Sequence, residues 1–180
     1  MGKATQDLRT EHDAILYVLQ ILDKMMLSGN SEPKSQLRYY GELVYFLEIF
    51  ADKCHHGKEE NYLFKELVQK GFSDEDGPIA TLLGEHAQAR NYIAQMSLCL
   101  ENEDMNGFHV AAVQYRDLLR SHIKKETATI FVTADKLLDE KAQEQLFEEF
   151  EKYEETVIGH GVHEKLHAMI DTWAKAFGVE

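Results

Sequence analysis

The sequence predicts an all-α fold, an up-down-up-down four-helix bundle with an additional C-terminal helix. Apolar residues recur every three or four positions along each long segment, which is the period of an amphipathic helix. Strand-like alternation is absent, and the only two prolines stand in polar stretches typical of loops. We expect residues 1–180 to form a single domain, with the bundle over about 3–140 and the fifth helix over about 142–177.

Four polar breaks divide the chain into five helical segments. The first two breaks contain the prolines, in SGNSEPKS at 28–35 and GFSDEDGP at 71–78, and the weaker ones are ENEDMNG at 101–107 and LLDEKAQ at 137–143. Glycine, proline and small polar residues favour turns at such places. The connections are short, so successive helices should be antiparallel neighbours.

The first two segments each have a histidine in their apolar stripe. Over residues 8–26 the stripe alternates by three and four, and His12 occupies one of its positions. In the second segment, roughly 34–70, His56 and Glu60 are in phase with the apolar residues that follow. Side chains four residues apart point the same way off a helix, so His56 and Glu60 should face the bundle interior together.

The third and fourth segments repeat this arrangement. His86 lies in the stripe of residues 79–100, and His122 with Glu126 lies in the stripe of residues 115–137. If the connecting loop is centred near residue 104, His86 and His122 stand at the same height on antiparallel helices. Each of the four segments therefore brings one histidine to a position that calls for an apolar residue.

The fifth segment is strongly apolar on one face. Left alone it would expose side chains from Phe147 to Trp173, so it must pack on the bundle or on a partner. It contains HEKLH at 163–167, which has the spacing of a zinc-protease motif. Such a protease needs a third ligand, often a histidine six residues later, where this chain has Trp173. We therefore discount a protease.

The buried histidines and carboxylates predict a metal site. Four imidazoles and two carboxylates inside a bundle would be costly without a compensating ion. Their order along the chain suggests two half-sites, the first His12 with His56 and Glu60, and the second His86 with His122 and Glu126. Imidazole and carboxylate without thiolate suit a pair of iron ions, with manganese or zinc as the less favoured alternatives.

The charge and composition exclude several functions. The net charge of -13 repels nucleic acid and anionic membranes, so neither is an expected partner. No apolar run is long enough to span a membrane, and the first residues lack the apolar core of a secretory signal. Cys54 and Cys99 give no disulfide framework. We expect a cytoplasmic protein.

Four stretches of the chain resemble the hemerythrin-like, HHE cation-binding domain family. They are EHDAIL, FADKCHHGKEENYLFKEL, GEHAQARNYI and LLRSHIKKETATIF, in the family's order and over nearly the whole chain. The resemblance implies a four-helix bundle around an oxo- or hydroxo-bridged di-iron centre, in which Glu60 and Glu126 bridge the ions. The ligands that the resemblance implies are His12, His56, Glu60, His86, His122 and Glu126.

Two departures from the oxygen-carrying members leave one imidazole missing. Those proteins carry HxxxH on the third helix, where this chain has Arg90 four residues after His86, and HxxxxD on the fourth, where this chain has HxxxE. We expect His163 or His167 to supply the missing ligand; alternatively, both are ordinary surface histidines. His55 is expected to stand behind His56, and Glu59 to be an exposed carboxylate or an additional ligand.

The function that this pattern favours is a non-haem di-iron protein that binds or senses oxygen, nitric oxide or peroxide. A peroxide-disproportionating, catalase-like enzyme is the first alternative. The second is an interaction module whose fifth helix responds to iron or oxygen. The sequence identifies no protein partner.

Overall fold

The computed structural model describes residues 1–28 and 33–180, and within these ranges every regular element is a helix. The predicted all-α class is confirmed. The predicted loop at 28–35 falls largely on residues 29–32, which lie outside the described residues, and the chain is helical again from Pro33. The elements are α1 (Lys3–Leu27), α2 (Pro33–Phe46), η1 (Leu47–His56), η2 (Glu59–Leu63), α3 (Phe64–Gln69), α4 (Gly77–Glu101), α5 (Met105–Ala128), α6 (Ile130–Leu137), α7 (Glu140–Tyr153), η3 (Glu154–Gly159) and α8 (Val162–Phe177).

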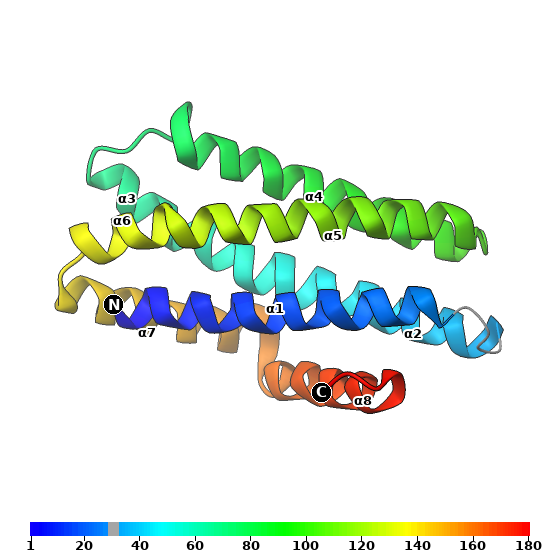
Figure 1. Cartoon of the computed structure of the whole chain (residues 1–180). Coiled ribbons are helices and arrows are strands. Elements are labelled where there is room, and N and C mark those ends of the chain that lie inside the picture. The colour runs from blue at the N-terminus through cyan, green and yellow to red at the C-terminus, as the bar shows by residue number, and fades with distance from the viewer. Residues whose placement is uncertain (29–32) are drawn as a thin grey trace.

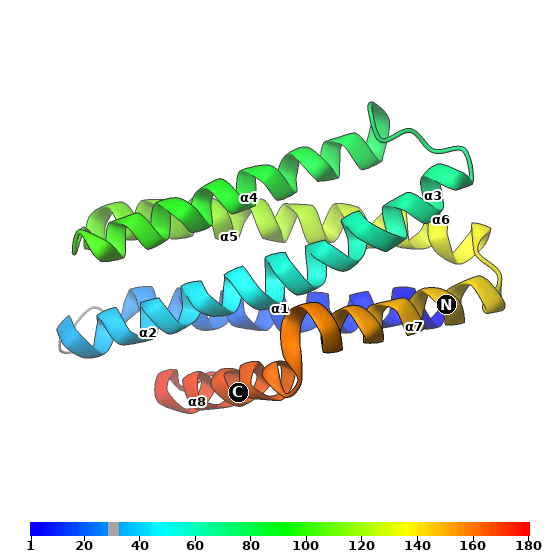
Figure 2. The same ribbon diagram turned by 180° about the vertical axis from the view of Figure 1, so that it is seen from behind.

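Four long rods lie side by side and alternate in direction (Figure 1). The first rod is α1, the second runs from α2 through η1 and η2 to α3, the third is α4, and the fourth is α5 with α6. Figure 2 shows the same arrangement from behind, with α7 beside the N-terminal half of α1 and α8 in a separate layer along α1 and α2. The structure thus confirms the predicted four-helix bundle with an addition at its C-terminus.

The second rod departs from α-helical geometry in its middle. The stretches Leu47–His56 and Glu59–Leu63 are π-helical. A π-helix bonds residue i to i+5, so each residue rotates less about the axis than in an α-helix, and such turns are frequent at functional sites. The smaller rotation allows His55 and His56, which are neighbours, to face the interior together. Each of them is only 1% exposed.

The apolar core is divided into two clusters, one toward each end of the bundle. One cluster includes Ile15, Ala51 and Ala89, and the other includes Leu8 and Leu63. Between these positions, at the same level in each rod, the chain carries buried histidines and glutamates. A polar layer therefore crosses the middle of the bundle, with apolar packing on both sides that excludes water.

The predicted continuous helix at 142–177 is interrupted. His160 has an extended ψ of 131°, and Gly161 adopts a left-handed conformation with φ 72°, which a glycine accepts without steric cost. The chain turns at this corner, and α8 continues in a new direction along the bundle. Near the C-terminal end of α8, the Trp173 side chain is buried and donates a hydrogen bond from Nε1 to Glu42 at 2.9 Å. The apolar face of the C-terminal segment thus packs on the chain's own bundle.

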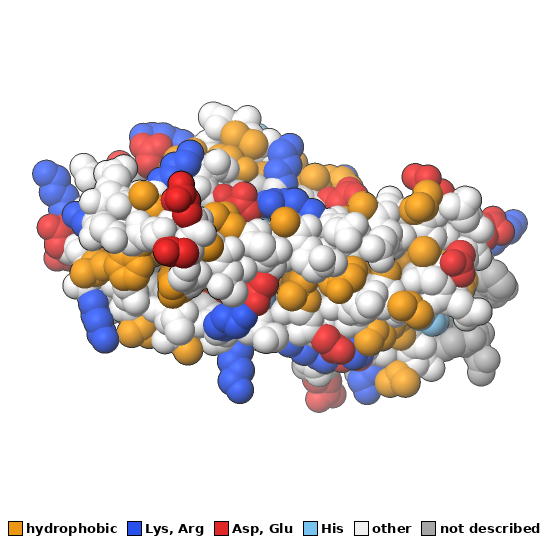
Figure 3. Space-filling model, turned by 90° about the horizontal axis from the view of Figure 1, so that it is seen from above, with side chains coloured by type: hydrophobic (Ala, Val, Ile, Leu, Met, Phe, Trp, Pro, Cys, Tyr) orange, Lys and Arg blue, Asp and Glu red, His pale blue; other side chains and the backbone are white. Residues whose placement is uncertain are grey.

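The outer surface carries charges of both signs. On the face seen from above, Lys, Arg, Asp and Glu side chains are interspersed with apolar ones, and only small areas of histidine are visible (Figure 3). Most of the histidines that the sequence singled out are therefore not displayed on that face. Among the described helices, none has the length and apolar character needed to cross a bilayer.

Candidate metal centre

The polar layer contains two compact groups of potential metal ligands. In each group the ligand atoms lie within 4.8 Å of one another, and all the residues are buried. The first group is His56, Glu59, His86 and His122, and the second group is His12, His55, Glu59 and Glu126. All four rods contribute, and Glu59 belongs to both groups.

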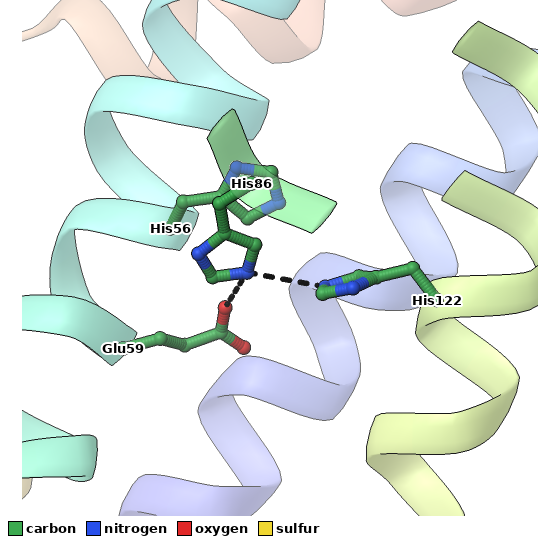
Figure 4. Close-up of side chains that lie close together, drawn as sticks. All are labelled: His56, Glu59, His86 and His122. Carbon is green, nitrogen blue, oxygen red and sulfur yellow. Dashed lines mark hydrogen bonds and ion pairs between the residues drawn. The ribbon is translucent and has the colours of Figure 1, made fainter. Parts of the chain in front are cut away.

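The first group brings three imidazoles together around one carboxylate oxygen (Figure 4). His86 Nε2 lies 3.2 Å from His122 Nε2 and 3.4 Å from Glu59 Oε2. The His56 ring stacks on the His86 ring, with 3.8 Å between their centroids. Two imidazole nitrogens this close repel each other unless a proton or a metal ion lies between them.

The second group pairs two imidazoles with two carboxylates. His55 Nε2 lies 3.1 Å from Glu59 Oε1, and His12 Nε2 lies 3.4 Å from Glu126 Oε2. Glu126 Oε2 is also 3.3 Å from His122 Nε2 of the first group. Glu59 and Glu126 therefore both stand between the two groups, where bridging carboxylates of a dinuclear site would be needed.

A hydrogen-bond partner outside the groups holds the Nδ1 atom of each imidazole. His12 contacts Thr127 Oγ1 at 3.1 Å, and the other four histidines contact carboxylates. Because an ionised carboxylate only accepts, the Nδ1 of these four must carry the proton, which leaves Nε2 to bind a metal when the ring is neutral. The carboxylate partners are Glu11 for His55 (2.8 Å), Asp52 for His56 (3.3 Å), Glu60 for His86 (2.8 Å) and Glu85 for His122 (2.8 Å).

Unsatisfied buried atoms show that the two groups fit metal ions. Among the described residues, seven ligand atoms of these groups are buried and have no hydrogen-bond partner. Such atoms cost free energy unless something binds them, and here they all face the same layer. They are Nε2 of His12, His55 and His56 and both carboxylate oxygens of Glu59 and Glu126.

Protons take the place of positive metal charge in the metal-free protein. Burial opposes protonation of His55, but the carboxylates of Glu59 and Glu11 outweigh it and raise its pKa to about 10. Burial also opposes protonation of His86, whose pKa is nevertheless raised to about 9 by Glu59 and Glu60. A metal ion has to displace these protons, so metal binding and proton release are coupled.

Two other imidazoles are held in the neutral form, which is the form that binds metal. Burial and the positive charge of His86 hold the pKa of His56 well below its usual range. Burial and the positive charge of His55 likewise lower the pKa of His12. Burial alone would raise the pKa of Glu59, but His55 and His86 hold it well below its usual range, so its carboxylate is charged.

Five of the predicted ligands lie in the two groups, namely His12, His56, His86, His122 and Glu126. They are divided differently from the predicted half-sites, because His56 joins His86 and His122 while His12 joins Glu126. Glu60, predicted as a bridging ligand, lies outside both groups. Its side chain is 24% exposed and accepts hydrogen bonds from Arg90 and from His86 Nδ1. It orients a potential ligand from outside the layer.

Glu59 and His55 correct the sequence analysis. The expectation that Glu59 is an exposed carboxylate is wrong, because it is fully buried and belongs to both groups. The expectation that His55 stands behind His56 is also wrong, since both face the layer and each belongs to a different group. The π-helical geometry of this rod is the physical reason, because it turns both neighbours inward.

His163 and His167 do not reach the two groups. His163 lies with Glu11 and Glu154 in a separate cluster, and His167 belongs to no such cluster in the part of the chain that the structure describes. The left-handed corner at Gly161 places both residues on α8, outside the four rods. The fifth imidazole of the polar layer comes from His55 instead.

We expect His55→Ala to bind about one metal ion fewer per chain than His167→Ala at equal metal excess. The reason is that the second group has only two imidazoles, and this change removes one of them. Metal content after dialysis measures the difference, with far-ultraviolet circular dichroism as the check that both variants fold. A loss confined to His167→Ala would restore the sequence-based assignment of that residue as a ligand.

The comparison with known families agrees with this geometry. The family model of the hemerythrin HHE cation binding domain matches residues 3–134, which span the four rods up to α6. No curated protein and no solved structure gave a match. The matched region covers well over half of the chain and includes both ligand groups. The chain therefore belongs to the hemerythrin HHE cation-binding domain family.

Proposed function

We propose that this protein is a non-haem di-iron protein that binds or senses oxygen, or a related small molecule such as nitric oxide or peroxide. The observation that supports the proposal is the sharing of Glu59 by two buried groups of imidazoles and carboxylates. No cysteine belongs to either group, and burial raises the pKa of the nearby Cys54 thiol, so a thiolate ligand is not supplied. Imidazole with carboxylate suits iron, and less well manganese or zinc.

Iron held by such ligands supplies redox chemistry and a binding position for a small molecule. The protein's own contribution is to hold the donors in place. The carboxylates around the layer fix the imidazole rings through Nδ1, which keeps each Nε2 directed inward. The apolar clusters above and below the layer keep bulk water away.

The two groups are unequal, which favours small-molecule binding at the second. The first group offers three imidazoles, whereas the second offers only His12 and His55. A surface pocket of about 490 Å³ is lined by His12 and Thr127 and by Arg9 and Arg120. We infer that a small ligand approaches the layer from this side.

Metal content and the optical spectrum of the purified protein test the proposal. We expect about two irons per chain, with near-ultraviolet charge-transfer bands that change on reduction and return in air. Hydrogen peroxide then separates the two classes of function. Reversible, stoichiometric spectral change supports a binder or sensor, whereas turnover on the order of 1 per second or faster indicates the catalase-like alternative. One zinc ion and no colour would contradict the di-iron proposal.

A further inference from the structure

A third cluster of potential ligands lies outside the polar layer, at the corner between η3 and α8. We propose that Glu11, Glu154 and His163 bind a divalent first-row transition-metal ion, in addition to the pair in the layer. Their donor atoms lie within 4.8 Å of one another. Imidazole with carboxylate favours ions such as Fe²⁺, Co²⁺ or Zn²⁺ over Ca²⁺ and Mg²⁺, which prefer oxygen ligands alone.

The imidazole of His163 contributes a donor atom to this cluster. Its Nε2 atom is buried and lacks a hydrogen-bond partner among the described residues. The ring packs against Phe50, with 5.3 Å between the ring centroids, and this contact fixes its orientation. Gly161 makes this placement possible, because its left-handed conformation turns the first residues of α8 back toward the bundle.

The carboxylates of the cluster already attract a cation. The Lys58 ammonium is fully buried and donates to Glu11 at 2.7 Å, to Asp7 at 2.9 Å and to Glu154. Burial opposes its charge, but Glu11 and the other carboxylates outweigh this and raise the pKa of Lys58. The Lys58 ammonium and the protonated His55 ring together face three carboxylates, so negative charge remains for a metal ion. When a metal ion binds Glu11 and Glu154, Lys58 keeps its ion pair with Asp7.

An acidic pocket connects the cluster to solvent. Its volume is about 420 Å³. Carboxylates gathered around a concave surface raise the local concentration of cations. Metal ions can therefore reach Glu154 and His163, which are half-buried, without opening the bundle. The residues of the pocket that carry this argument are Glu151, Glu154, Glu155, His160, His163 and Glu164.

Glu11 joins this cluster to the metal layer. One of its oxygens accepts from Lys58, and the other accepts from His55 Nδ1 at 2.8 Å. A change at Glu11 would therefore disturb both places at once. His163 and Glu154 belong to neither group of the layer, so they are the residues that test the third site separately.

Equilibrium dialysis of the full-length, metal-free protein against Co²⁺ tests the proposal. We expect the wild type to bind about one ion more per chain than His163→Ala or Glu154→Gln. His167→Ala is the matched control, because it removes a neighbouring histidine that belongs to no ligand cluster in the described chain, and it should bind as many ions as the wild type. Circular dichroism confirms that each variant is folded.

A Glu59→Gln variant separates this proposal from the dinuclear one. It should lose binding in the layer while keeping one Co²⁺ that is sensitive to His163→Ala. Equal Co²⁺ stoichiometry for the wild type, His163→Ala and Glu154→Gln would overturn the third site and leave the dinuclear proposal standing. Retention of one ion by the wild type, with its loss in His163→Ala, would support the third site and overturn the dinuclear proposal.

Discussion

Glu59→Gln should reduce the metal content from about two ions per chain in the layer to fewer than one. Glu59 is the only residue that both groups share, and it is fully buried, with Oε1 facing His55 and Oε2 facing His86. Glutamine keeps the size of the side chain but removes its charge and one of its two metal-binding oxygens. Both ions would then lose a common ligand, so the effect should exceed that of any single histidine change. Metal analysis after dialysis against a fixed excess of Fe²⁺ without oxygen measures it.

Glu60→Gln is the matched control for this prediction. It makes the same chemical change at the next residue, but Glu60 only holds His86 Nδ1 and Arg90 from outside the layer. Loss of such a supporting hydrogen bond costs about 10- to 100-fold in metal affinity. At saturating metal this variant should still bind about two ions in the layer. Equal losses in the two variants would contradict the assignment of Glu59 as the shared ligand.

The fold could be predicted from the sequence because its signals are local. A helical period of apolar residues depends only on the spacing of neighbours along the chain, and the loops are marked by proline, glycine and acidic residues. The polar layer was also predictable in part. His12, His56, His86 and His122 each interrupt an apolar stripe. One such histidine is usually an ordinary core residue, whereas four together indicate a site.

The motif HHGKEE explains why the sequence favours Glu60 over Glu59 as the bridging ligand. His55 with Glu59 and His56 with Glu60 have the same spacing of four, so the sequence alone does not distinguish the two pairs. The choice of His56 with Glu60 assumed α-helical rotation, in which only one of two neighbouring histidines faces the axis. The π-helical turns remove that restriction, and π-helix formation depends on packing around the site rather than on a residue pattern.

His163 lies outside the polar layer because the C-terminal segment is broken at Gly161. The apolar period of the sequence does not reveal this break. The stripe of the C-terminal segment continues from Phe147 to Trp173, which favoured one long helix. The signal for a corner was present in Gly159 and Gly161, both of which have positive φ values. Two glycines so close together inside a helical pattern indicate an interruption more strongly than the apolar period indicates continuity.

Removal of metal should lower the melting temperature strongly. At a free metal concentration about 100 times the Kd, each ion bound only by the folded protein contributes about 2.7 kcal/mol. For a chain of this size, 1 kcal/mol corresponds to about 2–4 °C. Two ions in the layer should therefore raise the melting temperature by about 10–20 °C relative to the metal-free protein. Thermal unfolding followed by circular dichroism, with and without a chelator, measures the difference.

The difference in melting temperature between the metal-loaded and the metal-free protein should widen as the pH rises. In the metal-free protein the pKa values of His55 and His86 are raised to about 10 and about 9, so their protons stabilise the fold fully only below the unfolded value of about 6.5. This contribution decreases as the pH rises and is lost once the pH passes the folded values. In the loaded protein the metal ions replace these protons, so no such loss is expected. A gap in melting temperature that stays constant between about pH 7 and about pH 10 would mean that His55 and His86 are not the residues whose protons the metal displaces.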